Sequence, residues 1–313
     1  MRIGVSPYHL TTREAPAMAA LLIASEVVTA VPGPVGAHAA VAARSAAERA
    51  PAFRELVRSW AWSEQLWQEG VLRPDADGRE TIDEALAVLR GIAIDPRYAP
   101  LRRLMRDETG DEDLYLNAVA GDLLKGGPDP GVLIPISAAI DRVCATHACA
   151  VARSHPQSVA QRAEMALMHE PRTIVLPVFT QADALRILHA RDVLQEPLDT
   201  LREQLARLAA HQAAPGLDEA AAVYARAFEQ NREDLFDDAA HDEVRAIDSA
   251  VSITMGFLPA DAVLRSSLAA IGTMGLDASE GTVEDPSIPV LRDVVEDRSF
   301  LALTLRTLGQ ASR

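Results

Sequence analysis

Five short runs of β-branched or aliphatic residues organise the chain, and each is followed by a polar or proline-bearing turn and then by helix-forming sequence. Strands of a parallel sheet are continuously apolar, because helices cover both faces of such a sheet. The pattern therefore predicts an α/β fold with a mostly parallel sheet of about five strands. The predicted strands are Ile3–Val5, Val27–Val31, Val132–Ile136, Ala148–Ala152 and Thr173–Val178.

Helix-forming sequence with breaks separates the second and third predicted strands, so a helical insertion is expected at about 37–124. Its clearest start signal is a capping box, in which Glu84 follows Thr81 by three residues. Beyond residue 180 the chain favours helices again, at 182–213, 217–251, 259–274 and 290–308, with Pro197 interrupting the first. These patterns predict a helix-rich protein of two parts. An α/β sheet domain occupies 1–180, and a helical C-terminal half at 181–313 packs on it.

Composition narrows the class of partner. The 313 residues are 49% hydrophobic, which is ample for a core, and the formal charge of −15 disfavours nucleic acid, whose phosphates need a basic stripe on the protein. Lys125 is the only lysine beside twenty-nine arginines (30 Lys+Arg minus 1), a ratio that GC-rich coding explains without any function. We therefore expect no nucleic-acid partner.

Cysteine content and hydropathy indicate the compartment. Cys144 and Cys149 are too few to build a disulfide framework for a chain of this length, and the first residues do not have the pattern of a signal peptide. No apolar run reaches the roughly 18 to 20 residues that cross a bilayer. The sequence predicts a cytoplasmic protein with no disulfide and no membrane partner.

Polar residues follow the first predicted strand, where an α/β sheet collects its ligands. Tyr8 and His9 come directly after it, and we expect them to be the catalytic groups if the protein is an enzyme, since histidine titrates near neutral pH. Thr11 and Arg13 open the next helix, whose free N–H groups and positive dipole end favour an anion. These four residues are candidates for one site.

Similar residues follow two later strands. Arg153 and Ser154 come after the run at 148–152, and Gln181 comes after the run at 173–178. We expect the two arginines, Arg13 and Arg153, to hold a negatively charged ligand and Ser154 and Gln181 to orient it. Trp62 lies off the helical face of the other tryptophans, so it is a candidate wall of the cleft or a subunit contact. The competing interpretation is that these residues are ordinary helix caps and surface arginines.

Other chemical motifs are weak. The dinucleotide, phosphate-loop, nucleophile-elbow and zinc-protease fingerprints are absent, so no particular cofactor is indicated. Four residues near 150 have metal-binding atoms, but a helix and a strand would hold them too far apart for one tetrahedral site, and we predict no metal there. They are Cys144, His147, Cys149 and His155. Acidic residues of 217–251, at intervals of four, form a solvated helix face rather than a dinuclear site. They are Glu229, Glu233 and Asp237, with His241 next in the series.

Two functions follow from these observations. The first is a protein that binds a small anionic or polar metabolite at the carboxyl ends of parallel strands, with or without catalysis. The alternative is a non-enzymatic interaction or adaptor protein that docks a partner protein on its acidic C-terminal helices. A homodimer is expected in either case, because it is the commonest assembly of such proteins.

Overall fold

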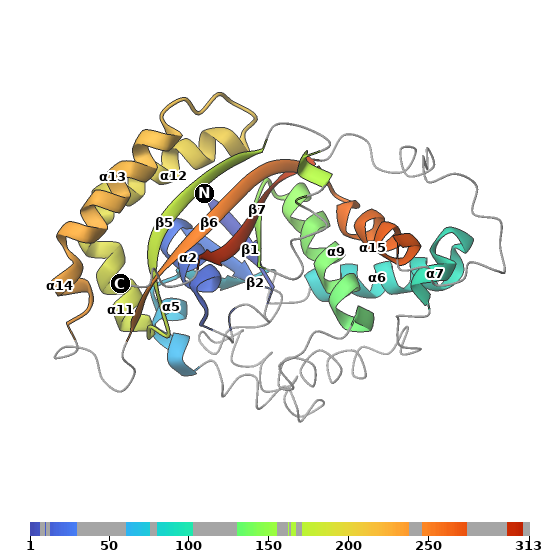
Figure 1. The fold of residues 1–313 in the computed structure, drawn as a ribbon. Coiled ribbons are helices and arrows are strands. Elements are labelled where there is room, and N and C mark those ends of the chain that lie inside the picture. Colours follow the sequence, from blue (N-terminus) through green and yellow to red (C-terminus); the bar gives the residue numbers. More distant parts are fainter. Residues whose placement is uncertain are drawn as a thin grey trace.

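The structure is a computed structural model (Figure 1). It describes residues 1–6, 10, 13–29, 61–75, 80–102, 130–154, 162, 164–166, 171–237, 246–273 and 299–308.

A seven-stranded mixed sheet forms the centre of the described chain, in the order β3-β2-β1-β4-β7-β6-β5. Its strands are β1 (Arg2–Val5), β2 (Glu26–Thr29), β3 (Leu72–Pro74), β4 (Ala150–Ser154), β5 (Arg172–Thr180), β6 (Ile247–Pro259) and β7 (Ser299–Leu308). Strands β3, β2, β1, β4 and β7 pair in parallel, whereas β6 is antiparallel to both β7 and β5. It follows that β5 runs in the same direction as β7. The carboxyl ends of six strands therefore lie along one edge of the sheet.

Two groups of helices accompany the sheet (Figure 1). The helices α2 (Ala15–Ile23), α11 (Ala184–Val193), α12 (Gln195–Ala209), α13 (Leu217–Gln230) and α14 (Arg232–Leu235) lie with the curved β5–β6 side. The helices α6 (Glu80–Ile94), α7 (Ala99–Arg102), α9 (Pro130–Thr146) and α15 (Ala262–Thr273) pack on one another and form a second, smaller apolar cluster. The short α5 (Glu64–Gln68) contacts α11. None of the helices in the described ranges combines the length and apolar character that a membrane span requires.

Helix α2 is the centre of the main core. Its sequence, APAMAALLI, has no polar side chain, and all nine residues are buried. It contacts β5, β6 and β7 as well as α11 and α12. A helix that is apolar all round is stable in water only when it is covered on every side, and the curved sheet together with the two helices provides that cover.

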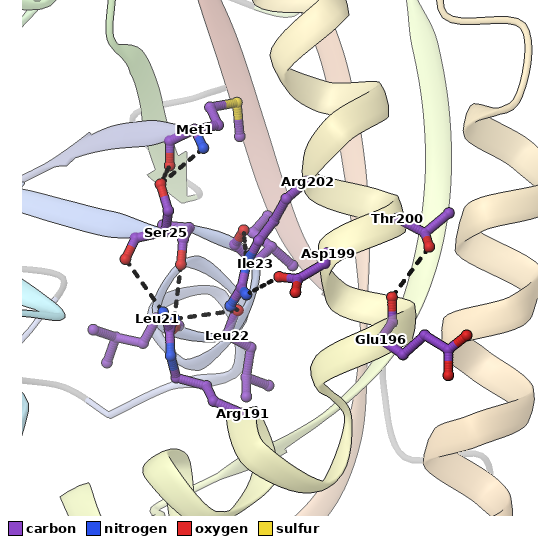
Figure 2. Close-up of polar contacts among 11 residues, drawn as sticks. Met1, Leu21, Leu22, Ile23, Ser25, Arg191, Glu196, Asp199, Thr200 and Arg202 are labelled. Carbon is purple, nitrogen blue, oxygen red and sulfur yellow. Dashed lines mark hydrogen bonds and ion pairs between the residues drawn. The ribbon is translucent and has the colours of Figure 1, made fainter.

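Two arginines satisfy the carboxyl-terminal end of α2 (Figure 2). A helix leaves its last carbonyl groups without internal partners, and here no polar side chain of the helix itself is available. The guanidinium groups of Arg191 and Arg202 donate hydrogen bonds to the carbonyl oxygens of residues 21–25. Burial, followed by the charge of the neighbouring Arg202, lowers the pKa of Arg191 to about 10. Asp199 pairs with Arg202 at 2.9 Å and offsets part of this charge.

The structure confirms an α/β fold and strands at four of the five predicted places, but corrects three assignments. Residues 132–136, predicted as a strand, belong to α9. A short apolar run is compatible with a buried helix or a strand, and its continuation through Ala138 and Ile140 has helical spacing. The helix predicted at 217–251 ends at Gln230, and the one predicted at 290–308 is replaced within the described residues by β7.

The prediction missed three strands: β3, which lies within the insertion predicted as helical, and β6 and β7, which follow residue 180. In β6 the buried residues Val251, Ile253 and Met255 alternate with half-buried polar residues, which is the period of a strand. In β7 residues 300–305 are all buried, because neighbours cover both of its faces. The chain after residue 180 thus supplies two strands of the sheet, so it is not the wholly helical half that was predicted.

Candidate functional site

Three residues predicted for the ligand site meet at the carboxyl edge of the sheet. The backbone N–H of Gln181, just after β5, donates a hydrogen bond of 3.0 Å to the carbonyl oxygen of Arg13. The Arg13 guanidinium lies over the ring of Trp62, 5.7 Å from its centroid, within the range of a cation–π contact. Residues separated by more than 100 positions are therefore neighbours beside α2, α5 and α11.

The backbone at this meeting point is strained. Arg13 has φ of 48° and Gln181 has φ of 58°, in the left-handed region that side chains with a β-carbon disfavour by about 1–2 kcal/mol per residue. Such conformations persist when the surrounding structure enforces them, and they concentrate at binding and catalytic sites. Here the two strained residues are bonded to each other, which connects the entrance of α2 to that of α11.

Donor groups are in excess at this meeting point. The indole Nε1 of Trp62 is buried and has no hydrogen-bond partner in the structure as described. The N-cap residue of α2, Glu14, makes no side-chain hydrogen bond to its helix, whereas the Asp183 carboxylate caps α11 by accepting from the Arg186 N–H at 2.7 Å. Arg13, Trp62 and Gln181 together are called the Arg13–Trp62–Gln181 group. The Arg13 guanidinium supplies its positive charge, and the group offers N–H donors to a ligand.

The ends of β2 and β3 carry a second polar pair. Asp75 follows β3, and its carboxylate accepts a hydrogen bond of 2.5 Å from the backbone N–H of Thr81 at the start of α6. Burial raises the pKa of Asp75 to about 6. The other carboxylate oxygen of Asp75 and the hydroxyl of Thr29, the last residue of β2, are buried without partners among the described residues. Asp75 can therefore hold or release a proton near neutral pH.

Arg153 has different surroundings from Arg13. Its guanidinium is buried and bonds to the Asp141 carboxylate and, at 2.8 Å, to the Ser137 carbonyl oxygen, both on α9. Asp141 is fully buried, and this burial raises its pKa to about 7 despite the attraction of Arg153. The structure thus places Arg153 in a buried ion pair on α9 and not in the Arg13–Trp62–Gln181 group.

Further carboxylates extend this ion pair. Burial raises the pKa of both Glu164 and Asp261, and Arg265 pairs with each of them. The Ser266 hydroxyl donates a hydrogen bond of 2.9 Å to Glu164. Three acids with raised pKa values, Asp141 included, therefore lie within one partly buried network of charges that includes Arg153.

Sequence reasoning missed these acids as well as Asp75. One signal was present for Asp141: it lies four residues after Ser137, on the apolar side of a helix, where a charged residue needs a partner. The other acids came from separate segments, so no local pattern connected them.

The remaining predicted residues fall outside this description. Tyr8, His9 and Thr11 are not among the described residues, and His155 and His241 are likewise outside them. Ser154 ends β4, but only its backbone is described. No three histidine, cysteine, aspartate or glutamate side chains within the described ranges are grouped so that they could hold a metal ion.

The fold and this edge define a mixed α/β protein with a cationic, donor-rich group where the segment before α2 meets the short connection between β5 and α11. Comparison with family models, with curated proteins and with solved structures finds no match to this chain.

Proposed function

We propose that this protein binds a small anionic or polar metabolite at the carboxyl edge of its sheet, through Arg13, Trp62 and Gln181. The observation that carries the proposal is the hydrogen bond between Gln181 and Arg13, which joins two strained loops beside Trp62. A guanidinium, an unpartnered indole N–H and an uncapped helix entrance favour an acceptor-rich ligand, a carboxylate or a phosphate.

Catalysis is part of the same proposal. Tyr8 and His9 stand five and four residues before Arg13 in the sequence, and we propose that they reach this group. Asp75, whose pKa burial raises to about 6, is a third group able to transfer a proton at the same edge of the sheet. Thr11 and Ser154 belong to the proposed ligand contacts, whereas Arg153 does not, because its guanidinium is bonded to Asp141 and to the Ser137 carbonyl oxygen.

Two variants separate the effect of the Arg13 charge from the effect of its strained backbone. Arg13→Gly removes the guanidinium but accepts a positive φ without strain, so the variant should unfold at the same temperature as the wild type or higher. Ala148→Gly is the matched control, because Ala148 has φ of 52° at a different place in the fold. Thermal unfolding is measured with inorganic phosphate, pyrophosphate and citrate as probes.

We expect at least one probe to raise the unfolding temperature of the wild type and of Ala148→Gly, and to leave Arg13→Gly unchanged. Equal stabilisation of all three proteins would show that the anion binds elsewhere. Trp62→Phe then tests the indole N–H, since it keeps the ring and should weaken binding less than Arg13→Gly does.

A second candidate is the interaction role, and one observation favours it. A groove of about 290 Å³ lies between the edge strand β5 and α13, lined by Val175, Asp218 and Ala222 among others. The side chain of Val175 is 51% exposed, and the outer edge of β5 has no strand partner in the described chain. The occupant we propose is β5 of a second copy of the chain. The two β5 strands would pair edge to edge and form a homodimer, the commonest assembly of such proteins.

Measurement of molar mass in solution separates this second candidate from the first. Val175→Arg places a charge at the proposed contact and should convert a dimer to a monomer, while anion binding persists. A wild-type protein that stays monomeric at high concentration would rule out this homodimer and leave the first proposal intact.

We also propose a reducing, cytoplasmic location. Its support is that Cys144 and Cys149 are both free thiols.

A further inference from the structure

Cys144 and Cys149 are brought together where α9 ends. The backbone N–H of Cys149 donates a hydrogen bond of 2.9 Å to the carbonyl oxygen of Cys144, and Ala148 between them has a left-handed backbone. This is the six-to-one hydrogen bond of a Schellman helix terminus, in which the side chains of the first and last residues frequently touch. In most proteins that contact joins two apolar side chains, whereas here it joins two thiols.

The surroundings confine both sulfur atoms. Cys144 and Cys149 are free and buried; the Cys149 thiol donates a hydrogen bond of 3.6 Å to the carbonyl oxygen of His147, and its sulfur interacts with the Cys144 thiol. Gly4 of β1 lies against the Cys144 sulfur, where any β-carbon would overlap it. The Cys144 sulfur therefore lies between β1 and Cys149.

The two thiols differ in acidity. The hydrogen bond from Cys144 lowers the pKa of Cys149 to about 7, and the positive charges of Arg2 and His147 add to this effect against burial and Glu26. The same hydrogen bond, with burial and the nearby Asp141 carboxylate, raises the pKa of Cys144, and Arg153 opposes it. Cys149 is consequently the more acidic of the two thiols and is partly ionised at neutral pH, whereas Cys144 retains its proton.

We propose that Cys144 and Cys149 form a reversible redox site that a hydroperoxide converts from dithiol to disulfide. The site needs no ligand at the Arg13–Trp62–Gln181 group, so it stands independently of the proposed function. Disulfide formation needs an acidic thiol and a second thiol close enough to attack it, and this helix terminus supplies both.

Two steps complete the oxidation. The Cys149 thiolate attacks one oxygen of hydrogen peroxide, so that an S–O bond forms, the O–O bond breaks, and the departing hydroxide takes a proton to become water. The Cys144 sulfur then loses its proton and attacks the Cys149 sulfur; an S–S bond forms and the S–O bond breaks, which releases a second water. The two thiols lose two electrons, which the two peroxide oxygens gain.

The test treats the full-length reduced protein with hydrogen peroxide, quenches it in acid and alkylates it in urea, where burial no longer protects a thiol. We expect no alkylation of the monomeric oxidised protein and full alkylation of both cysteines after treatment with dithiothreitol. Peroxide-treated protein that still alkylates at both cysteines, or that forms a disulfide between two chains, would overturn the proposal.

Single variants test the assignment of roles. In Cys144→Ser, or in Cys144→Ala if the serine variant does not fold, Cys149 should accumulate as a sulfenic acid that dimedone captures. In Cys149→Ser, Cys144 should stay unlabelled at neutral pH. Equal dimedone labelling of the two single variants would contradict the roles assigned to the two sulfur atoms, and with them the site.

Discussion

Nη1 of Arg191 lies 2.7 Å from the carbonyl oxygen of Ala24, at a sequence separation of 167 residues. The same side chain also bonds to the carbonyl oxygens of Leu21 and Ser25. An arginine of α11 thus completes the hydrogen bonding of α2, the most buried helix of the described chain.

Replacement of Arg191 by alanine should be strongly destabilising, because it leaves several buried carbonyl groups without donors. We expect the free energy of unfolding to fall by about 3 kcal/mol, since each buried unsatisfied group costs about 1–3 kcal/mol. Arg226→Ala is the matched control: Arg226 is an exposed arginine paired with Glu219 at 3.1 Å, and its loss should cost less than about 0.5 kcal/mol. Urea denaturation measures both, and equal losses would contradict this role for Arg191.

Two glycines should respond in opposite ways to alanine. A β-carbon at Gly4 would overlap the Cys144 sulfur, so Gly4→Ala should lower stability by about 1–3 kcal/mol. Gly91 lies within α6 with no atom near its missing β-carbon, and Gly91→Ala should raise stability by about 0.5–1 kcal/mol.

The double variant Gly4→Ala with Cys144→Ala checks the cause of the Gly4 effect. Removal of the sulfur should restore part of the stability lost in Gly4→Ala. If the stability losses of the two single variants simply add in the double variant, the strain caused by Gly4→Ala does not come from the Cys144 sulfur but from elsewhere in β1.

The pH dependence of stability should report on Asp141. Its pKa rises on folding from 3.8 to about 7, so the folded state binds more protons than the unfolded state between these values. The Asp141 contribution is therefore fully present below pH 3.8 and is lost as the pH rises through about 7.

Asp141→Asn cannot titrate, so the stability of the wild type relative to this variant should decline as the pH rises through that window. Asp192→Asn, at an exposed carboxylate of α11, is the matched control for the loss of a carboxylate. A stability difference between wild type and Asp141→Asn that stays constant with pH would mean that Asp141 does not hold its proton in the folded state.

Local patterns were sufficient for some elements and for part of the site. Apolar runs predicted β1, β2, β4 and β5, and the helix predicted from Thr81 is α6, although Thr81 lies inside that helix rather than at its N-cap. Arg13, Trp62 and Gln181 were predicted as site residues from their places after strands and off a helix face. Their contact was not predictable in detail, because β5 lies at the far edge of the sheet and reaches α2 only through the curvature of the sheet.

The errors arose where the same local pattern fits two structures. The run at 132–136 is apolar enough for a strand, yet it lies in α9. The leucine-rich sequence of β7 suits a helix until neighbours on both of its faces are known. Arg153 follows a strand as Arg13 does, but Asp141 on α9 supplies its partner.

By itself the sequence determined the class of the fold, several strands, and the complete burial of α2, since a nine-residue segment without a polar side chain can be stable only inside a core. The tertiary structure alone decided which polar groups meet. Arg191 with Ala24, Arg153 with Asp141, and Gln181 with Arg13 are polar pairs between segments far apart in the sequence. Periodicity along the chain records that a residue is buried, but only the folded arrangement specifies the partner that satisfies it.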